Sequence, residues 1–102
     1  MTKVSFDRAK LELRIEGHAG HAALGRDIVC AAESILLYTL LDWVQRREAL
    51  MHPQVFLTEG NARIVCRPER KDTRRCREIM EAVFRGYELL AEGYPMCVEI
   101  KK

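Results

Sequence analysis

The 102-residue chain is predicted to fold as one α+β domain, residues 1–102, with two helices against a five-stranded mixed sheet. Three observations predict this two-layer fold. Several short stretches carry apolar residues at every second position, as strands do. Two longer stretches carry them at three- and four-residue steps, as helices do. The elements follow in the order ββαββαβ, and a composition of 48 % hydrophobic and 31 % charged residues is that of an ordinary globular protein.

Two strands are expected at the start of the chain. Val4 and Phe6 alternate with polar neighbours, and Leu11, Leu13 and Ile15 alternate strictly with charged residues. A period of two with one apolar side indicates a strand that has one buried face and one wet face. We therefore expect an antiparallel hairpin whose outer face is polar.

The longest helix is expected from Asp27 to about Arg47, after a glycine-rich loop that runs from Gly17 to Gly25. Asp27 is interpreted as its N-cap, the residue whose side chain accepts hydrogen bonds from the first turn. Apolar side chains cover nearly the whole circumference of this helix. Such a helix must be covered on more than one side, and the polar face of the sheet does not supply a second cover. We therefore expect a second copy of the chain to do so, in a homodimer.

The second half of the chain repeats the hairpin–helix order. Residues 54–67 are expected to form a hairpin with a tight turn at Gly60-Asn61. Asp72 or Thr73 is expected to cap the second helix, which has one apolar stripe and ends at Gly93 as a C-terminal cap. Residues 96–100 complete the sheet as a last strand.

Composition narrows the class of protein. The chain has no uninterrupted run of eighteen apolar residues, and its N-terminal stretch lacks the apolar core of a signal peptide, so we expect a cytoplasmic protein without a membrane partner. The four cysteines show neither a C-x-x-C pair nor zinc-ligand spacing. Cys66 and Cys76 are expected to be buried apolar groups, whereas Cys97 falls on the polar phase of its strand.

A basic cluster follows the second hairpin. Its seven residues are Arg63, Arg67, Arg70, Lys71, Arg74, Arg75 and Arg77. Such a cluster is usually a solvated face, and no aromatic residues alternate with it to stack on bases. The formal net charge of +2 adds no indication of a nucleic-acid partner, and none is expected to bind directly.

Cys30 would be the third residue of a helix that begins after Asp27, close to the positive end of the helix dipole. That position favours the thiolate, and His18 lies twelve residues upstream on a loop whose glycines permit it to fold back. These are the components of a cysteine nucleophile, for which backbone N–H groups around Cys30 would bind the oxyanion.

Three other interpretations of this stretch stay open. The loop is a plain connector and Cys30 a packed thiol, or the glycines cradle a phosphate, or His18, His21 and Cys30 hold a metal ion. Against the phosphate site, the loop has no G-K-[ST] ending, and Asp27 places a carboxylate where the anion would bind. Against the metal site, no fourth ligand lies nearby in the sequence.

The chain closely resembles the bacterial ribosomal-processing cysteine proteases called Prp over about eighteen residues. The residues that carry the resemblance are Gly17-His18-Ala19, Gly25, Asp27-Ile28-Val29-Cys30-Ala31-Ala32 and Ser34. The resemblance implies a Cys30–His18 catalytic dyad, with Gly17, Gly25, Asp27 and Ser34 supporting it or binding substrate, and no cofactor. It further implies a small homodimeric cytoplasmic endopeptidase, which removes the N-terminal extension of a large-subunit ribosomal protein by cutting between an aromatic and a small residue.

Two features of the chain fall outside this resemblance. His21 has no counterpart in the family signature, and Glu33 is charged where a small or apolar residue would be expected, which bears on substrate preference. The alternative function, from a different class, is a non-catalytic ribosome- or RNA-associated module that uses the basic cluster. The two hypotheses differ in whether Cys30 is an acidic thiol.

Overall fold

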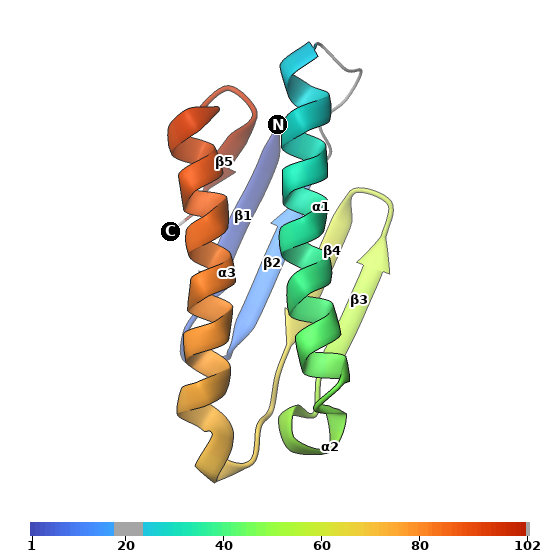
Figure 1. The fold of residues 1–102 in the computed structure, drawn as a ribbon, viewed down its shortest axis with the longest axis vertical. Helices are drawn as coiled ribbons and strands as arrows, with labels where there is room; N and C mark the ends of the chain where they lie inside the picture. Colours follow the sequence, from blue (N-terminus) through green and yellow to red (C-terminus); the bar gives the residue numbers. More distant parts are fainter. Residues whose placement is uncertain (18–23, 102) are drawn as a thin grey trace.

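A computed structural model describes residues 1–17 and 24–101, and the backbone alone of residues 24–27. Figure 1 shows the elements in chain order. They are β1 (Thr2–Asp7), β2 (Glu12–Glu16), α1 (Leu24–Gln45), α2 (Glu48–Met51), β3 (Gln54–Thr58), β4 (Asn61–Val65), the 3-10 turn η1 (Arg70–Asp72), α3 (Thr73–Gly93) and β5 (Val98–Ile100). This order confirms the predicted ββαββαβ succession, to which the short α2 and η1 are additions.

In the described part of the chain, the strands form one five-stranded sheet in the order β3-β4-β2-β1-β5. β1 and β2 pair as an antiparallel hairpin with Val4 opposite Ile15, and β3 and β4 pair as a second one. β5 lies parallel to β1, so the sheet is mixed, as predicted.

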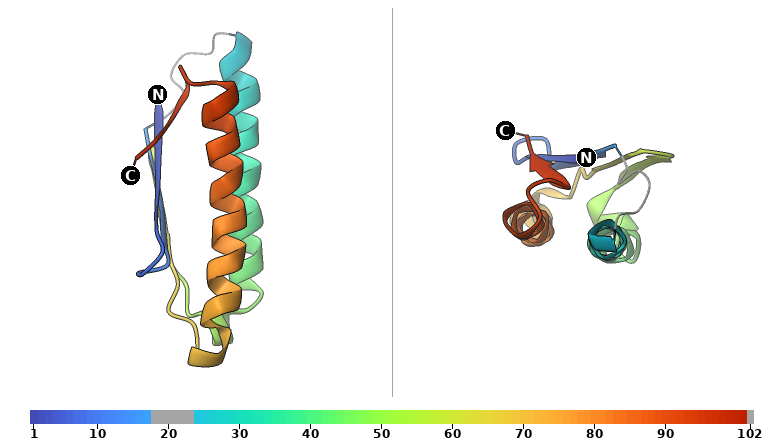
Figure 2. Two further views of the ribbon diagram at one scale, coloured as in Figure 1. Left: turned by 90° about the vertical axis from the view of Figure 1, so that its left-hand side faces the viewer. Right: turned by 90° about the horizontal axis from the view of Figure 1, so that it is seen from above.

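Both long helices pack on the same face of the sheet, which makes two layers (Figure 2). The inward-facing strand residues Val4, Leu13 and Ile64 are almost completely buried beneath them. Their neighbours in sequence, among them Arg14 and Arg63, point to the opposite, uncovered face. The period-two pattern therefore predicted correctly which face of the sheet the helices cover.

The two helices are joined through a buried tyrosine. Tyr87 of α3 is 0 % exposed, and its hydroxyl donates a 2.8 Å hydrogen bond to the backbone carbonyl of Glu33 in α1. Burial raises the pKa of Tyr87, so the hydroxyl stays protonated and remains a donor. This bond connects elements that are 54 residues apart.

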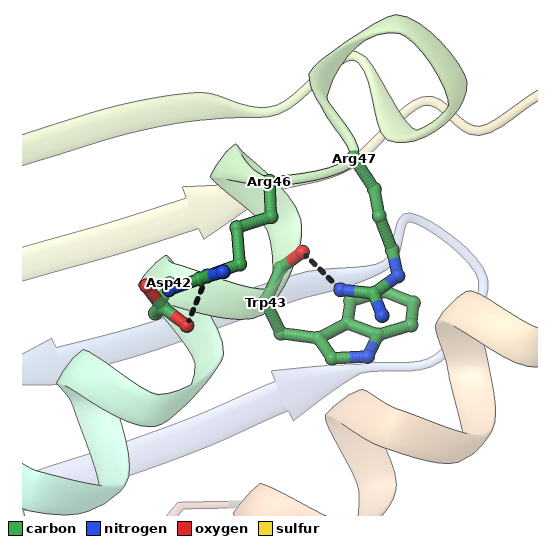
Figure 3. A network of polar contacts seen from close by, with 4 residues as sticks. All are labelled: Asp42, Trp43, Arg46 and Arg47. Carbon is green, nitrogen blue, oxygen red and sulfur yellow. Dashed lines mark hydrogen bonds and ion pairs between the residues drawn. The ribbon is translucent and has the colours of Figure 1, made fainter.

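Two arginines that follow α1 contact side chains and backbone of its last turn (Figure 3). Arg46 pairs with Asp42 at 2.9 Å. Arg47 donates a 3.1 Å hydrogen bond to the carbonyl of Trp43 and lies 4.4 Å from the centroid of its indole ring. Arg75 of α3 lies 5.4 Å from the centroid of the same ring, which links the two helices near this end.

The first boundary of α1 was predicted wrongly. The helix begins at Leu24, three residues before Asp27, and ends at Gln45. Gly25 therefore lies inside its first turn and Asp27 is its fourth residue, not its N-cap. The glycine pattern therefore placed the end of the loop too late.

Smaller boundary errors have local causes. Leu11 precedes β2 instead of belonging to it and adopts a positive φ of 54°, although its side chain is buried as predicted. The second hairpin turns one residue earlier than expected, because Gly60 takes a positive φ of 78° and Asn61 already belongs to β4. Asp72 is the N-cap of α3 but makes no side-chain capping bond. Gly93 is the last residue of α3, and Tyr94 is the C-cap in its place.

One segment of α1 is long and apolar enough to cross a membrane, by length and composition alone. Residues Ile28–Gln45 have a mean hydropathy of 1.4, and 22 % of them are buried. Val29, Leu40 and Val44 are 0 % exposed and pack into the core beneath the helix. One stripe of the helix thus packs into the core, whereas other apolar side chains lie exposed on its surface.

We predict that Tyr87→Phe lowers the free energy of unfolding by about 1 kcal/mol, because it removes the hydrogen bond to the Glu33 carbonyl at a fully buried position. Urea denaturation measures the change. Tyr94→Phe is the matched control, since the Tyr94 side chain is 40 % exposed and its substitution should leave stability unchanged. Equal effects of both substitutions would contradict a structural role for the Tyr87 hydroxyl.

Candidate active site

A pocket of about 390 Å³ lies between α1 and the neighbouring ends of β2, β3 and β4. We call it the α1 pocket. Helix α1 contributes Glu33, Ser34, Leu37 and Tyr38 to its wall. The strand side contributes Gly17 and residues of β3 and β4 and the turn between them. Its volume falls in the range of roughly 300–1,000 Å³ that is usual for ligand pockets.

Cys30 precedes this helical wall by one turn. Ser34 and Leu37 follow Cys30 by four and seven residues, so the three lie along one side of the helix. The Cys30 side chain is partly buried. A nucleophile at this position would therefore stand at the end of the α1 pocket.

The helix start at Leu24 changes the electrostatic argument for Cys30. Cys30 is the seventh residue of α1, not the third as predicted. The effect of the helix dipole falls off within the first turn, so it does little to acidify this thiol. The helix dipole is therefore not what would make Cys30 a reactive thiolate.

The same shift moves the donors for an oxyanion. In an α-helix that begins at Leu24, the N–H of Cys30 donates to the carbonyl four residues earlier. The backbone N–H groups around Cys30, which were the expected donors, are therefore occupied. The N–H groups without an intrahelical partner are those of the first turn, residues 24–27, which includes Gly25 and Asp27.

Gly17 fixes the chain at the strand end of the pocket. It adopts a φ of +88°, and its N–H donates a 2.7 Å hydrogen bond to the carbonyl of Gly60. A Cβ at this position would lie 2.5 Å from the Met1 carbonyl oxygen. Only glycine satisfies both conditions. The residue immediately before His18 is thus held at the pocket wall.

The structure describes some of the predicted site residues and does not describe others. Gly17 and Ser34 lie together at the α1 pocket. Gly25 and Asp27 lie in the first turn of α1, where the backbone alone is described. His18 and His21 lie outside the described residues. Within residues 1–17 and 24–101, no group of three or more His, Cys, Asp or Glu residues could hold a metal ion.

Glu33 is a residue of this site that the sequence marked as unusual without assigning it a role. Its Oε2 atom accepts a 3.1 Å hydrogen bond from the hydroxyl of Thr2 in β1. Its Oε1 atom is buried and has no hydrogen-bond partner among the described residues. Burial raises the pKa of Glu33, and the Thr2 bond and the Met1 amino group oppose this only in part. The contact with Thr2 spans 31 residues, so no local pattern could have indicated it.

Two of the other cysteines are unsuited to be nucleophiles. Cys66 and Cys76 are 2 % and 0 % exposed, as predicted, and the Cys76 thiol donates a hydrogen bond to the Met80 sulfur at 3.9 Å. The neighbouring Cys76 thiol and burial raise the pKa of Cys66. All four cysteines lie in the described part of the chain and none is in a disulfide, which leaves Cys30 and Cys97 as the partly exposed thiols.

We predict that Glu33→Gln changes how stability depends on pH. An acid whose pKa is raised above its unfolded value of 4.5 binds more protons when the protein is folded, so stability falls as pH rises through the interval between the two values. The variant lacks this term, and its unfolding free energy relative to wild type should increase from about pH 4 to about pH 7.

Urea denaturation across that pH range measures the difference. Glu78→Gln is the control, because Glu78 is an exposed acid of α3 paired with Arg74. A difference between Glu33→Gln and wild type that stays constant or falls with pH would contradict the raised pKa.

Comparison with known proteins assigns the family. The family model described as Cysteine protease Prp matches residues 1–99. Among curated proteins, no sequence matches the chain. Similar folds occur in the essential ribosomal processing protease Prp of S. aureus, solved with a substrate peptide (TM-score 0.77, 20 % identity, 99 % of this chain and 98 % of that one), and in SMU.848 of Streptococcus mutans (TM-score 0.70, 25 % identity, 98 % and 90 %). A second structure of the S. aureus protease holds a covalently linked product peptide (TM-score 0.75, 20 % identity, 98 % and 95 %). The family match over nearly the whole chain confirms the resemblance found in the sequence, and the chain belongs to the cysteine protease Prp family.

Proposed function

We propose that the chain is a cysteine endopeptidase in which Cys30 is the nucleophile and His18 the general base and acid. One observation carries this assignment beyond the family match. The α1 pocket lies between Gly17, which immediately precedes His18, and Ser34, which follows Cys30 by one helical turn. Gly17 and Ser34, which are far apart in the sequence, thus lie on opposite sides of one peptide-sized pocket.

The proposed reaction has two stages. The Cys30 thiol gives its proton to His18, and the sulfur attacks the peptide carbonyl to form a tetrahedral oxyanion. The carbon–nitrogen bond then breaks, His18 protonates the departing amine, and an acyl-enzyme remains. Water, deprotonated by His18, attacks the acyl carbon and releases the carboxylic acid and the thiol. Gly25 and Asp27, in the first turn of α1, belong to the segment that would supply oxyanion donors.

For the substrate, we propose the N-terminal extension of a large-subunit ribosomal protein. The support is the family match and the fold shared with the ribosomal processing protease of S. aureus, which was solved with a substrate peptide. We place this activity in the cytoplasm, where ribosomal proteins are made, and we infer that residues 1–102 form the single catalytic domain. No cofactor takes part in the proposed reaction.

The alternative, a ribosome- or RNA-associated module, gains no specific support. Arg63 lies on the uncovered face of the sheet, 4.3 Å from the centroid of the Phe56 ring. Arg75 stacks on Trp43, and Arg74 pairs with Glu78 at 3.1 Å. These three members of the basic cluster have partners within the chain. Arg63 lies on the uncovered face of the sheet and Arg74 and Arg75 lie on α3, which packs on the opposite face, so the described structure offers no single basic surface made by the whole cluster.

We also propose that the chain acts as a homodimer through the exposed side of α1. Ile28, Ile35 and Tyr38 are 61 %, 62 % and 59 % exposed and lie near one another on that helix. Apolar side chains gathered on one face mark protein–protein contacts more often than isolated ones do. A second copy of the same helix would cover them.

We predict that Cys30→Ala and His18→Ala each lower the rate of precursor cleavage at least about 100-fold, because each removes one half of the dyad. The assay follows the purified ribosomal protein precursor by mass spectrometry. Cys97→Ser is the matched control, since Cys97 is the other partly exposed thiol, and it should cleave as wild type does.

Cleavage that survives in Cys30→Ala, or its loss in Cys97→Ser, would contradict the assignment of the nucleophile. Failure of the wild-type protein to cleave the precursor would contradict the proposed substrate.

We predict a solution mass of twice the chain's 11.8 kDa at micromolar concentration, measured by size-exclusion chromatography with light scattering. Ile35→Glu should yield monomers, because it places a charge in the proposed contact. Leu89→Glu is the control, since Leu89 is similarly exposed, at 56 %, but lies on α3. A monomeric wild type would contradict the dimer, and a dimeric Ile35→Glu variant would contradict the contact surface.

A further inference from the structure

We propose that the outer edge of β3 binds the substrate peptide, which pairs with Val55 and Leu57 as a sixth strand of the sheet and continues from there toward Cys30. The partner is an extended polypeptide segment, held mainly through its backbone. This inference rests on the proposed peptidase function and names the mode of substrate binding for it.

The first argument is the unpaired backbone of β3. This strand lies at one end of the sheet, and among the described strands it pairs only with β4. Just past β4, the Cys66 N–H donates to the carbonyl of Leu11, which precedes β2, so alternate residues of that strand bond to β2 and those between them bond to β3. In this register the backbone of Phe56 faces β4, whereas Val55 and Leu57 direct their N–H and C=O groups outward.

The second argument is the composition of this edge. Natural sheets usually protect a free edge with very short strands or with charged residues. β3 has five residues, none of them charged, and its Phe56 and Leu57 side chains are 48 % and 52 % exposed. The opposite edge strand, β5, has only three residues and carries Glu99 at its centre. Of the two edges, β3 is therefore the one suited to accept another strand.

The third argument is the continuity of this edge with the α1 pocket. Leu57 lines the pocket. Its side chain lies on the same side of the sheet as that of Val55, which is opposite the fully buried Ile64. In a paired strand, the side chain directly opposite Leu57 would point to that same side. A peptide on the β3 edge would therefore place alternate side chains next to the pocket wall.

The direction of β3 leads from this edge to the proposed nucleophile. β3 ends at Thr58, which lines the α1 pocket together with Ser34, and Ser34 follows Cys30 by one helical turn. Figure 1 shows β3 running toward the end of the molecule at which α1 begins. A peptide that continues past Thr58 in this direction approaches Cys30. The segment paired with β3 thus lies to one side of the bond to be cleaved.

A peptide fits this edge better than a second copy of the chain does. Two copies joined through antiparallel β3 strands would bring their helices to the same side of the enlarged sheet, beside the α1 pocket. A single peptide strand leaves the pocket accessible. The proposed contact between copies also lies elsewhere, at Ile28, Ile35 and Tyr38 on the exposed side of α1.

The test measures, by anisotropy, how a fluorescent peptide that spans the cleavage site of the precursor binds to Cys30→Ala, which keeps it intact. In a series of such peptides, each backbone N–H in turn is replaced by N-methyl, which removes the donor and keeps the side chain. We expect two N-methyl groups, two residues apart, each to weaken binding about fivefold. The N-methyl group between them points to solvent and should leave the dissociation constant unchanged.

A substitution in β3 assigns the effect to this edge. In the Cys30→Ala background, Leu57→Pro removes one outward N–H and leaves the ladder to β4 intact, since proline is tolerated on a sheet edge. Leu57→Ala is the matched control, because it also loses the leucine side chain but keeps the N–H. The peptide should bind Leu57→Pro about fivefold more weakly than Leu57→Ala.

The inference is overturned if the unmodified peptide does not bind, if N-methylation shows no period of two, or if Leu57→Pro binds as Leu57→Ala does. The N-methyl series decides the matter even where Leu57→Pro does not fold. Light scattering that finds Leu57→Pro monomeric and Leu57→Ala dimeric would assign the edge to a second copy and would also overturn it.

A parallel cleavage assay with the Cys30 protein separates the two proposals. Binding with a period of two but without cleavage would contradict the peptidase. Cleavage without that period would contradict only the role of β3.

Discussion

The rotation of α1 about its own axis determines the rest of the site. Val29, Leu40 and Val44 are 0 % exposed and fix one side of the helix against the core. Because a helix is stiff, burying that stripe sets the direction of every other side chain on it. Cys30 and Ser34 are thereby placed at the edge of the core, beside the α1 pocket, and Ile35 is directed away from it. The packing of α1 against the core thus sets the positions of Cys30 and Ser34.

Much of the fold was predictable because it depends on local periodicity. Alternation in Leu13 and Ile15 marked the inner face of β2, and three- and four-residue steps marked α3. The strand order was not predictable from the residues, since the parallel pairing of β1 with β5 joins the two ends of the chain. Local patterns carry no information about such a pairing.

The family was predictable from the motif, whereas the geometry around it was not. The residues between Gly17 and Ser34, including the spacing of His18 and Cys30, carried the resemblance to the family, which the match over residues 1–99 confirms. The start of α1 was misjudged because Gly25 and Asp27 look like a loop end and a cap, although both lie within the helix. Because the helix begins at Leu24, Cys30 lies beyond its first turn, and the helix dipole is not the source of an acidic thiol. The partners of Glu33, Thr2 and Tyr87, lie on other elements, so no local pattern indicated them.

The central claim, that His18 rather than the helix end activates Cys30, is tested most directly by alkylation of Cys30 with iodoacetamide across a pH series. Peptide mapping separates the labelling of Cys30 from that of the other three cysteines. The account predicts a midpoint for Cys30 below the ordinary thiol value of about 8.5 in the wild type, and a return to about 8.5 in His18→Ala. A wild-type midpoint at or above about 8.5, or one that His18→Ala leaves unchanged, would contradict it.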